Sequence, residues 1–140
     1  MTGNAEILLV RKDGALILQH RDDKPGITNP GLKTAFGGHI EEGETPFQAA
    51  HRELNEETNL NLPVDRLEFF GQYRKTKEVH GEDWDVYYFI AKDIDDTNLQ
   101  VFEGQGFVVI HNQKEAEEAH TSILMQQVLK DYYQQLKRAA

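Results

Sequence analysis

The sequence predicts an α/β fold in which a mixed β-sheet lies between helices. Two observations support this class: several short apolar runs have the length and residue types of strands, and the segments 46–58 and 122–137 have helical spacing. Along the chain, two strands and a third strand precede the first helix, and three more strands precede the second. A length of 140 residues suits one domain, so we expect residues 1–140 to form a single unit.

The first two strands form a predicted hairpin. Apolar runs at 6–10 and 15–20 flank Lys12-Asp13-Gly14, where glycine can take the positive φ of a tight turn. A surface loop rich in Gly, Pro, Asp and Asn follows over 21–31, and then a short strand over 32–36. The pair Gly37-Gly38 is expected to open a second turn that runs to Glu44.

Helix 46–58 is predicted from its start and end signals. Pro46 suits the first turn, and Thr45 or Glu44 stands at the cap. Asn59 stands where helices commonly end in a left-handed residue, which asparagine tolerates. One stripe of the helix is apolar and should pack on the sheet, and it consists of Phe47, Ala50 and Leu54.

The second half of the chain is predicted to add three strands and the closing helix. The strands cover 67–79, 84–91 and 106–110, and apolar residues on both alternations of 84–91 indicate that both sheet faces are covered. Helix 122–137 carries its expected apolar stripe at Leu124, Val128, Tyr132 and Leu136.

Composition excludes several classes of protein. A net charge of -9, from 24 acidic and 15 basic side chains, argues against a nucleic-acid polymer or a membrane surface as partner, because both require a basic face. The absence of cysteine excludes disulfides, thiolate zinc sites and a cysteine nucleophile. No apolar run approaches the ~18 residues of a membrane helix, and the first residues lack the features of a signal peptide. We therefore expect a cytoplasmic protein.

Three carboxylates gather on one side of helix 46–58. At about 100° per residue, Glu53, Glu56 and Glu57 share one wedge beside the apolar stripe, where they repel each other by a few tenths of a kcal/mol per pair. A hard divalent cation such as Mg²⁺ or Mn²⁺ removes this conflict, because it takes oxygen ligands and keeps substrate phosphates in its shell. Arg52 can hold one of these carboxylates in orientation. The other interpretation is a solvated acidic face with one Arg–Glu pair.

Residues 38–60 resemble the signature of the Nudix hydrolase family, G-x5-E-x7-R-E-U-x-E-E-x-G-U with U aliphatic. Gly38, Glu44 and the segment 52–60 stand at that spacing, with Asn59 in place of the final glycine. With average residue usage such a match arises on the order of 10⁻⁸ times per starting point. The resemblance implies the α/β/α sandwich of that family and hydrolysis of a nucleoside diphosphate linked to another group.

The resemblance also implies roles for individual residues. The metal ligands would be Glu53, Glu56, Glu57 and the Gly38 carbonyl, and Glu53 or Glu56 would accept the proton of the attacking water. Arg52 and Glu44 would orient the helix and its loop, with Gly37 in support. Glu103 lies in the glycine-flanked loop 102–106, which is similar to the loop from which many family members supply an additional metal ligand or base. An ordinary acidic loop residue is the alternative for Glu103.

Substrate contacts are predicted less specifically. Basic residues that could meet a distal phosphate are Arg21, Lys24, Lys33, Arg74, Lys75 and Lys77, each with solvated surface charge as its alternative. Arg74 is favoured among the strand residues, because an inward-pointing Arg suits bidentate phosphate contact. Aromatic residues that could stack on a base are Trp84, Tyr87 and Phe107, although core packing is the commoner role of such residues.

The expected activity is a Mg²⁺-dependent pyrophosphohydrolase, with Mn²⁺ as a possible substitute, acting as a monomer or homodimer on a small nucleotide. The Glu103 loop and the short chain favour a nucleoside triphosphate, including an oxidised or non-canonical one, giving a monophosphate and pyrophosphate. The alternatives are ADP-ribose, a nucleotide sugar or a dinucleotide. Two other classes stay open: a non-catalytic Nudix-like nucleotide sensor, and an acidic divalent-ion module that binds no nucleotide.

Overall fold

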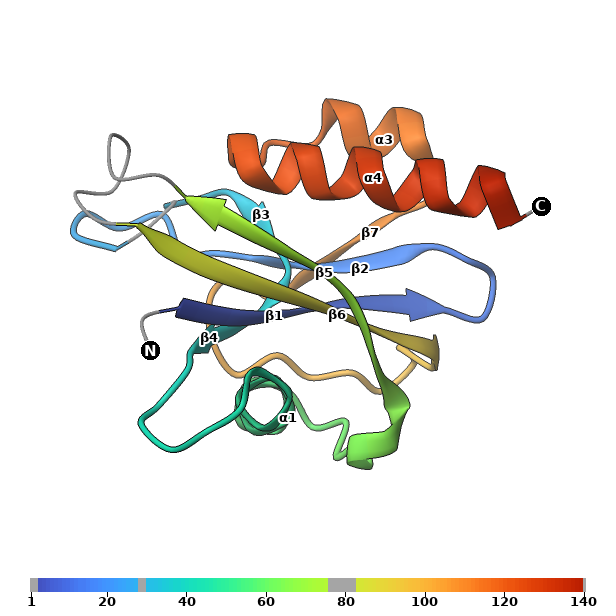
Figure 1. Ribbon diagram of the computed structural model, residues 1–140. Helices are drawn as coiled ribbons and strands as arrows, with labels where there is room; N and C mark the ends of the chain where they lie inside the picture. Colours follow the sequence, from blue (N-terminus) through green and yellow to red (C-terminus); the bar gives the residue numbers. More distant parts are fainter. Residues whose placement is uncertain (1–2, 28–29, 76–82, 140) are drawn as a thin grey trace.

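Seven strands form one mixed sheet between helices, as the computed structural model, which describes residues 3–27, 30–75 and 83–139, shows (Figure 1). Helix α1 (Pro46–Glu57) covers one face, and α3 (Gln113–Glu118) and α4 (Ile123–Ala139) cover the other. The predicted sandwich class is confirmed. The strands are β1 (Gly3–Arg11), β2 (Leu16–His20), β3 (Lys33–Thr34), β4 (Phe36–His39), β5 (Leu67–Lys75), β6 (Trp84–Ile94) and β7 (Phe107–Ile110).

Strand β1 is the centre of the sheet, whose order is β3-β2-β1-β6-β5. It runs parallel to β6 and antiparallel to both β2 and β4. Strand β4 pairs with the first half of β1, where Gly37 lies opposite Glu6, and β2 pairs with the second half, where Ile17 lies opposite Leu9. Strand β7 pairs with β2. The pairing of β1 is therefore divided between β4 and β2 along its length.

Both faces of the sheet are covered, which explains the nearly continuous apolar runs of β1 and β2. Leu8 and Leu18 pack in one cluster with Met125 and Leu129 of α4. The alternate residues, Ile7, Leu9 and Ile17, pack in a second cluster with Phe36 and with Ala50 and Leu54 of α1.

The turn predicted at Gly37-Gly38 is wrong, because both glycines belong to β4 and pair with β1. The single strand expected over 32–36 is divided between β3 and β4. The left-handed cap expected at Asn59 is also wrong: among the non-glycine residues in the described part of the chain, only Asn61 and Asp93 have positive φ. The Asn59 side chain instead accepts a hydrogen bond from the Gln100 N–H (2.9 Å) and donates one to the Asn98 carbonyl (2.9 Å).

The closing helix buries the predicted stripe in part. Val128 and Tyr132 are buried and Leu124 packs against the same cluster, whereas Leu136 is 44% exposed. The other buried residues of the helix are Met125, Leu129 and Tyr133. Helix α3 and the 3₁₀ turn at Val64–Arg66 were not predicted, and β6 continues past residue 91 to Ile94. The strand predicted over 67–79 is β5 as far as Lys75, and the rest of the predicted range lies outside the described residues.

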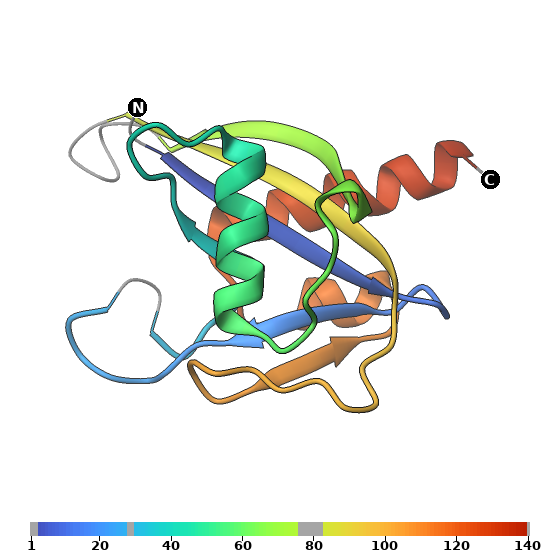
Figure 2. The ribbon, with the colours of Figure 1, turned by 90° about the horizontal axis from the view of Figure 1, so that it is seen from below.

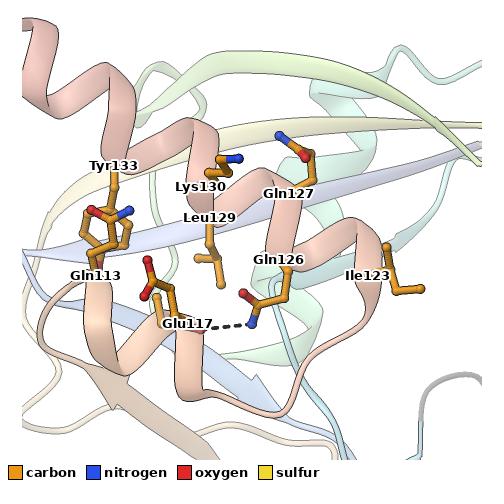
Figure 3. A pocket seen from close by; sticks show the side chains of 9 residues that line it. Gln113, Glu117, Ile123, Gln126, Gln127, Leu129, Lys130 and Tyr133 are labelled. Atoms are coloured by element: carbon orange, nitrogen blue, oxygen red, sulfur yellow. Dashed lines mark hydrogen bonds between the residues drawn. The ribbon is translucent and has the colours of Figure 1, made fainter.

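A cavity of about 350 Å³ lies between α3 and α4 (Figure 3). Gln126 closes one side of it, where its amide donates to the Ala116 carbonyl at 3.0 Å and the Ala119 carbonyl at 3.1 Å. Tyr133 also lines this cavity. Of the helices within the described ranges, none combines the length and apolar character needed to cross a membrane.

Candidate active site

Helix α1 begins at a capping box. The Thr45 hydroxyl accepts a hydrogen bond from the Gln48 N–H (3.1 Å), and the Gln48 side chain accepts one from the Thr45 N–H (3.0 Å). Thr45, rather than Glu44, is therefore the cap. Ala50 and Leu54 are fully buried against the sheet, which leaves Glu53 and Glu57 toward β4.

Strand β4 approaches this helix through its two glycines. A β-carbon on Gly38 would lie 2.7 Å from the Glu53 carboxylate, and one on Gly37, whose φ is +150°, would lie 2.1 Å from the Ala5 carbonyl oxygen. The Gly37 N–H donates to Glu57 Oε1 at 2.9 Å. Because neither glycine has a side chain, two carboxylates of α1 can lie directly against the backbone of β4.

Arg52 connects the carboxylate side of α1 to the loop before it. Its guanidinium donates to both oxygens of Glu44 (2.7 and 2.9 Å), to Glu53 Oε1 (2.9 Å) and to the His39 carbonyl (3.1 Å), and it lies 3.3 Å from Glu56 Oε2. Arg52, helped by the Glu41 N–H, lowers the pKa of Glu44 to about 2. Glu44 therefore stays ionised at neutral pH and keeps Arg52 in place.

The three motif carboxylates have different surroundings. Glu57 is 4% exposed, and burial together with the negative charges of Glu6, Glu53 and Glu103 raises its pKa to about 8. Burial also raises the pKa of Glu53, against the opposing effect of Arg52. Glu56 is 58% exposed on the outer side of Arg52. Two carboxylates therefore lie on the inner side of the helix and one on the outer side.

Glu6 on β1 joins this acidic group and was not predicted. Burial raises its pKa to about 7, while the Asn4 side chain, which donates to Oε1 at 3.2 Å, and the charges of Lys75 and Arg21 oppose the shift. The available signal was a single acidic residue inside an apolar strand. A local pattern could not connect it to α1, because β1 and α1 are far apart in the sequence and pack on each other only in the folded protein.

A cleft of about 340 Å³ runs along this group of residues. Its polar lining includes Asn4, Glu6, Arg21, His39, Glu53, Lys75 and Glu103, with the backbone of Gly37 and Gly38 between them. The structure thus brings together Gly37, Gly38, Glu53, Glu103 and Arg21 of the predicted set in one cleft. Glu44, Arg52, Glu56 and Glu57 lie at its side, in or next to α1.

The other predicted contacts lie outside the cleft. Arg74 is 58% exposed and pairs with Asp85 (3.0 Å) and Asp83 (3.6 Å), so the expectation that it points inward is wrong. Its neighbour Lys75 lines the cleft instead, because successive residues of a strand point to opposite faces. Trp84 donates to Asn4 Oδ1 (3.0 Å) and packs edge-on to His39. Lys77 lies outside the described residues.

Lys33, Tyr87 and Phe107 were also predicted as substrate contacts. Lys33 lies on β3, where its backbone N–H donates to the His120 carbonyl (2.8 Å), and it does not line the cleft. Tyr87 and Phe107 are partly buried and pack against the apolar cluster beneath α1. Core packing is therefore the arrangement seen for these two aromatic residues.

The donor atoms near Gly38 fit a hard divalent cation in their chemistry. Carboxylate and carbonyl oxygens are the ligands that Mg²⁺ prefers. The pKa of Glu57 is raised first by burial and then by the negative charges of Glu6, Glu53 and Glu103, which a cation would offset. Within the described ranges, no three His, Asp or Glu side chains form a ready metal-binding group. The acidic residues therefore have suitable chemistry, but their side chains are not drawn into a closed coordination shell.

We expect the stability of the metal-free protein to depend on pH through Glu57. Its pKa is about 8 in the folded protein against an ordinary 4.5, so its contribution to the free energy of unfolding is full below about pH 4.5 and is lost as the pH rises to about 8. The free energy of unfolding, measured with urea, should therefore fall for wild type relative to Glu57→Gln as the pH rises from 5 to 8.

A matched variant, Glu42→Gln, removes an exposed carboxylate and should leave the difference from wild type constant over the same range. Adding Mg²⁺ at pH 8 should stabilise wild type more than Glu57→Gln. Parallel pH curves for wild type and Glu57→Gln would show that Glu57 titrates alike in both states, contrary to this expectation.

Comparison with known proteins identifies the family. A sequence model described as the NUDIX domain matches residues 2–134. An RNA pyrophosphohydrolase of Cereibacter sphaeroides is 35% identical over 88 residues, which are 59% of this chain and 51% of that protein. The chain therefore spans about half the length of the curated relatives it matches.

Solved structures share the fold over nearly the whole chain. A C. elegans Ap4A hydrolase in a binary complex has a TM-score of 0.74 at 21% identity, and the match covers 98% of this chain and 98% of that one. A MutT protein from Methanosarcina mazei has a TM-score of 0.79 at 15% identity, covering 97% of this chain and 95% of that one. At such identities these likenesses show the fold, whereas the match over residues 2–134 shows the family. The chain belongs to the NUDIX domain family.

Proposed function

We propose that this protein is a Mg²⁺-dependent pyrophosphohydrolase that cleaves a phosphoanhydride bond of a nucleoside triphosphate, releasing a monophosphate and pyrophosphate. The observation that carries the proposal is the arrangement around Gly38. Arg52 holds Glu44 and Glu53 at the side of a cleft, and the same cleft contains the cations Arg21 and Lys75 and the acidic residue Glu103. Such a cleft has groups both for divalent cations and for phosphate.

Each residue of the arrangement has a role in this proposal. Glu53, Glu57 and the Gly38 carbonyl, with Glu56 and Glu103, would hold the metal. A bound divalent ion offsets the charge on the phosphate oxygens and lowers the pKa of water. Glu53 accepts the proton of the water that attacks phosphorus, since it lines the cleft, whereas Glu56 lies on the outer side of Arg52. Lys75 and Arg21 contact the phosphates, and the bond to the leaving pyrophosphate breaks.

A substrate panel tests the proposal directly. The purified protein is incubated with nucleoside triphosphates, ADP-ribose, a nucleotide sugar, a dinucleoside tetraphosphate and a 5′-triphosphorylated oligoribonucleotide, with Mg²⁺ or EDTA. Phosphate, pyrophosphate and nucleotide products are then measured. We expect Mg²⁺-dependent release of pyrophosphate from nucleoside triphosphates at the highest kcat/KM.

The other members of the panel represent the competing substrates. Two relatives are named for RNA and for Ap4A, so higher kcat/KM on the oligoribonucleotide or the dinucleotide would replace the nucleoside triphosphate as substrate. The net charge of -9 argues against the polymer, because binding a polymer requires a basic surface. Nucleotide binding without turnover would support the sensor class, and Mg²⁺ binding without any nucleotide binding would support the ion module.

Glu103→Gln separates two roles for the loop acid. If Glu103 supplies a metal oxygen, we expect kcat/KM to fall about tenfold at low Mg²⁺ and to recover at saturating Mg²⁺. If it acts as a base, the loss remains at every Mg²⁺ concentration. A Mg²⁺ titration of initial rates measures this, and a variant equal to wild type at all concentrations would remove Glu103 from the site.

A further inference from the structure

A second cavity adjoins the cleft, and nothing described so far uses it. Its volume of about 460 Å³ lies within the range of roughly 300–1,000 Å³ typical of small-molecule sites. Arg21 and Glu103 line both cavities, so the two are neighbours. The residues that distinguish the second cavity are Gln19, Ile27 and Phe102, and we call it the Gln19–Phe102 pocket.

Gln19 is the buried polar residue of this pocket. It lies on β2 and is 4% exposed. Because alternate residues of a strand point to the same face, Gln19 points to the face of Ile17, which packs beneath α1. Its backbone pairs with Thr34 and Phe107, but its side-chain amide makes no hydrogen bond with any residue in the described ranges. The described side-chain polar atoms that are fully buried without a partner are Asn55 Oδ1 and Tyr133 Oη, so the Gln19 amide, which is not among them, keeps contact with the open space of the pocket. The amide therefore has a donor and an acceptor available to a ligand.

Phe102 presents an aromatic face at the same pocket. It is 58% exposed, yet its backbone is held by the hydrogen bond from its N–H to the Glu57 carbonyl (2.8 Å). The loop is also fixed to the end of β2, where the Gln105 N–H donates to the His20 carbonyl (2.8 Å). Gly104 approaches that carbonyl so closely that a β-carbon would lie 2.5 Å from it. Figure 2 shows this loop beside β2 and the end of α1.

A planar ring with a polar edge fits these two residues. Stacking of a base on an aromatic side chain contributes about 1–3 kcal/mol, and a glutamine amide pairs in a bidentate manner with the adjacent donor and acceptor of adenine. The pocket lies next to the cleft that holds the proposed phosphate contacts, with Arg21 and Glu103 common to both. Resting on the proposed function, we propose that the Gln19–Phe102 pocket binds the nucleobase of the substrate, with adenine stacked on Phe102 and paired with Gln19.

The contrast with the cavity between α3 and α4 supports this choice of site. That cavity has a similar volume, but the Gln126 amide on its wall already donates to backbone carbonyls, and it shares no lining residue with the cleft (Figure 3). It also lies on the opposite face of the sheet from α1. The Gln19–Phe102 pocket shares Arg21 and Glu103 with the cleft, and its glutamine amide makes no hydrogen bond with any residue in the described ranges.

Binding of adenosine 5′-monophosphate in the presence of Mg²⁺ tests the pocket without requiring turnover. We expect Phe102→Ala to weaken this binding about tenfold, measured by calorimetry, and to raise KM for ATP more than it lowers kcat. Phe69→Ala is the matched control, because Phe69 is 60% exposed on β5, at the far edge of the sheet, and it should bind as wild type does. Equal affinities of the two variants would overturn the proposal, as would failure of wild type to bind.

Purine riboside 5′-monophosphate, which lacks the 6-amino group, tests Gln19 specifically. Wild type should bind it about tenfold more weakly than adenosine 5′-monophosphate, and Gln19→Met should bind the two ligands alike. Equal binding by wild type would overturn the pairing with Gln19. If Phe102 controls binding but ATP is not hydrolysed, the pocket stands and the proposed hydrolysis is wrong. If ATP is hydrolysed and both variants bind as wild type, the pocket is wrong and the hydrolysis stands.

Discussion

Glu53→Gln should lower kcat for the substrate by at least about 10²-fold, with the fold retained. The reason is that Glu53 contributes in two ways to the proposed reaction, as a metal ligand beside Gly38 and as the acceptor of a proton. Glutamine keeps the shape of the side chain and a carbonyl oxygen for the Arg52 hydrogen bond at 2.9 Å, but it has no charge and cannot take the proton. Initial rates at saturating Mg²⁺ and substrate measure the loss.

The control for this change is Glu42→Gln, which removes an exposed carboxylate of the loop before α1 and should retain wild-type turnover. Urea unfolding of Glu53→Gln confirms that the protein still folds. Glu56→Gln is measured alongside, because Glu56 was the other predicted proton acceptor and lies on the outer side of Arg52. If Glu53→Gln and Glu56→Gln both turn over normally, the proposed site is wrong.

Gly37→Ala should lower the free energy of unfolding by about 3 kcal/mol or more. Its β-carbon would lie 2.1 Å from the Ala5 carbonyl oxygen and 2.8 Å from the Glu6 Cα, both backbone atoms of the paired strand. Relief of this overlap requires β4 to move away from β1, which also displaces the Gly37 N–H from Glu57. Urea unfolding measures the loss, and activity should fall with it.

Gly14→Ala is the control that separates the cost of the steric overlap at Gly37 from the cost of a positive φ. Gly14 also has positive φ, +89°, but a β-carbon there would meet nothing within 4 Å. Its substitution should destabilise the protein by about 1–2 kcal/mol, the cost of a left-handed non-glycine residue. A loss for Gly37→Ala no larger than that for Gly14→Ala would show that β4 accommodates the methyl group.

Features set by short-range signals could be predicted from the sequence. Helix α1 starts after Thr45 and contains Pro46 in its first turn, and its apolar and acidic sides follow from helical spacing alone. The pairing of Arg52 with Glu56 likewise depends only on two residues four positions apart. The cap prediction at Asn59 failed because the segment 98–101 gives that side chain two backbone partners, and such partners are invisible in a local pattern.

Features that depend on distant pairing could not be predicted. Gly37 and Gly38 resemble a turn, since glycine is unfavourable in strands, but the ladder with β1 overrides that preference. Glu6 joins the acidic group only because β1 lies between β4 and β6, and Lys75 reaches the cleft through the pairing of β5 with β6. Gln19 likewise lies beside the residues 102–104, far along the chain, because β7, which follows them, pairs with β2.

The division of β1 between β4 and β2 has a consequence for how this protein can change in evolution. The first half of β1 pairs with β4, which packs against α1 and its carboxylates. The second half pairs with β2, which leads into the loop after His20 and lies beside the loop of Phe102. Insertions and substitutions in those loops would alter the walls of the Gln19–Phe102 pocket without moving the glycines of β4. If the proposed function holds, the choice of substrate could change between relatives while the arrangement of carboxylates around β4 stays the same.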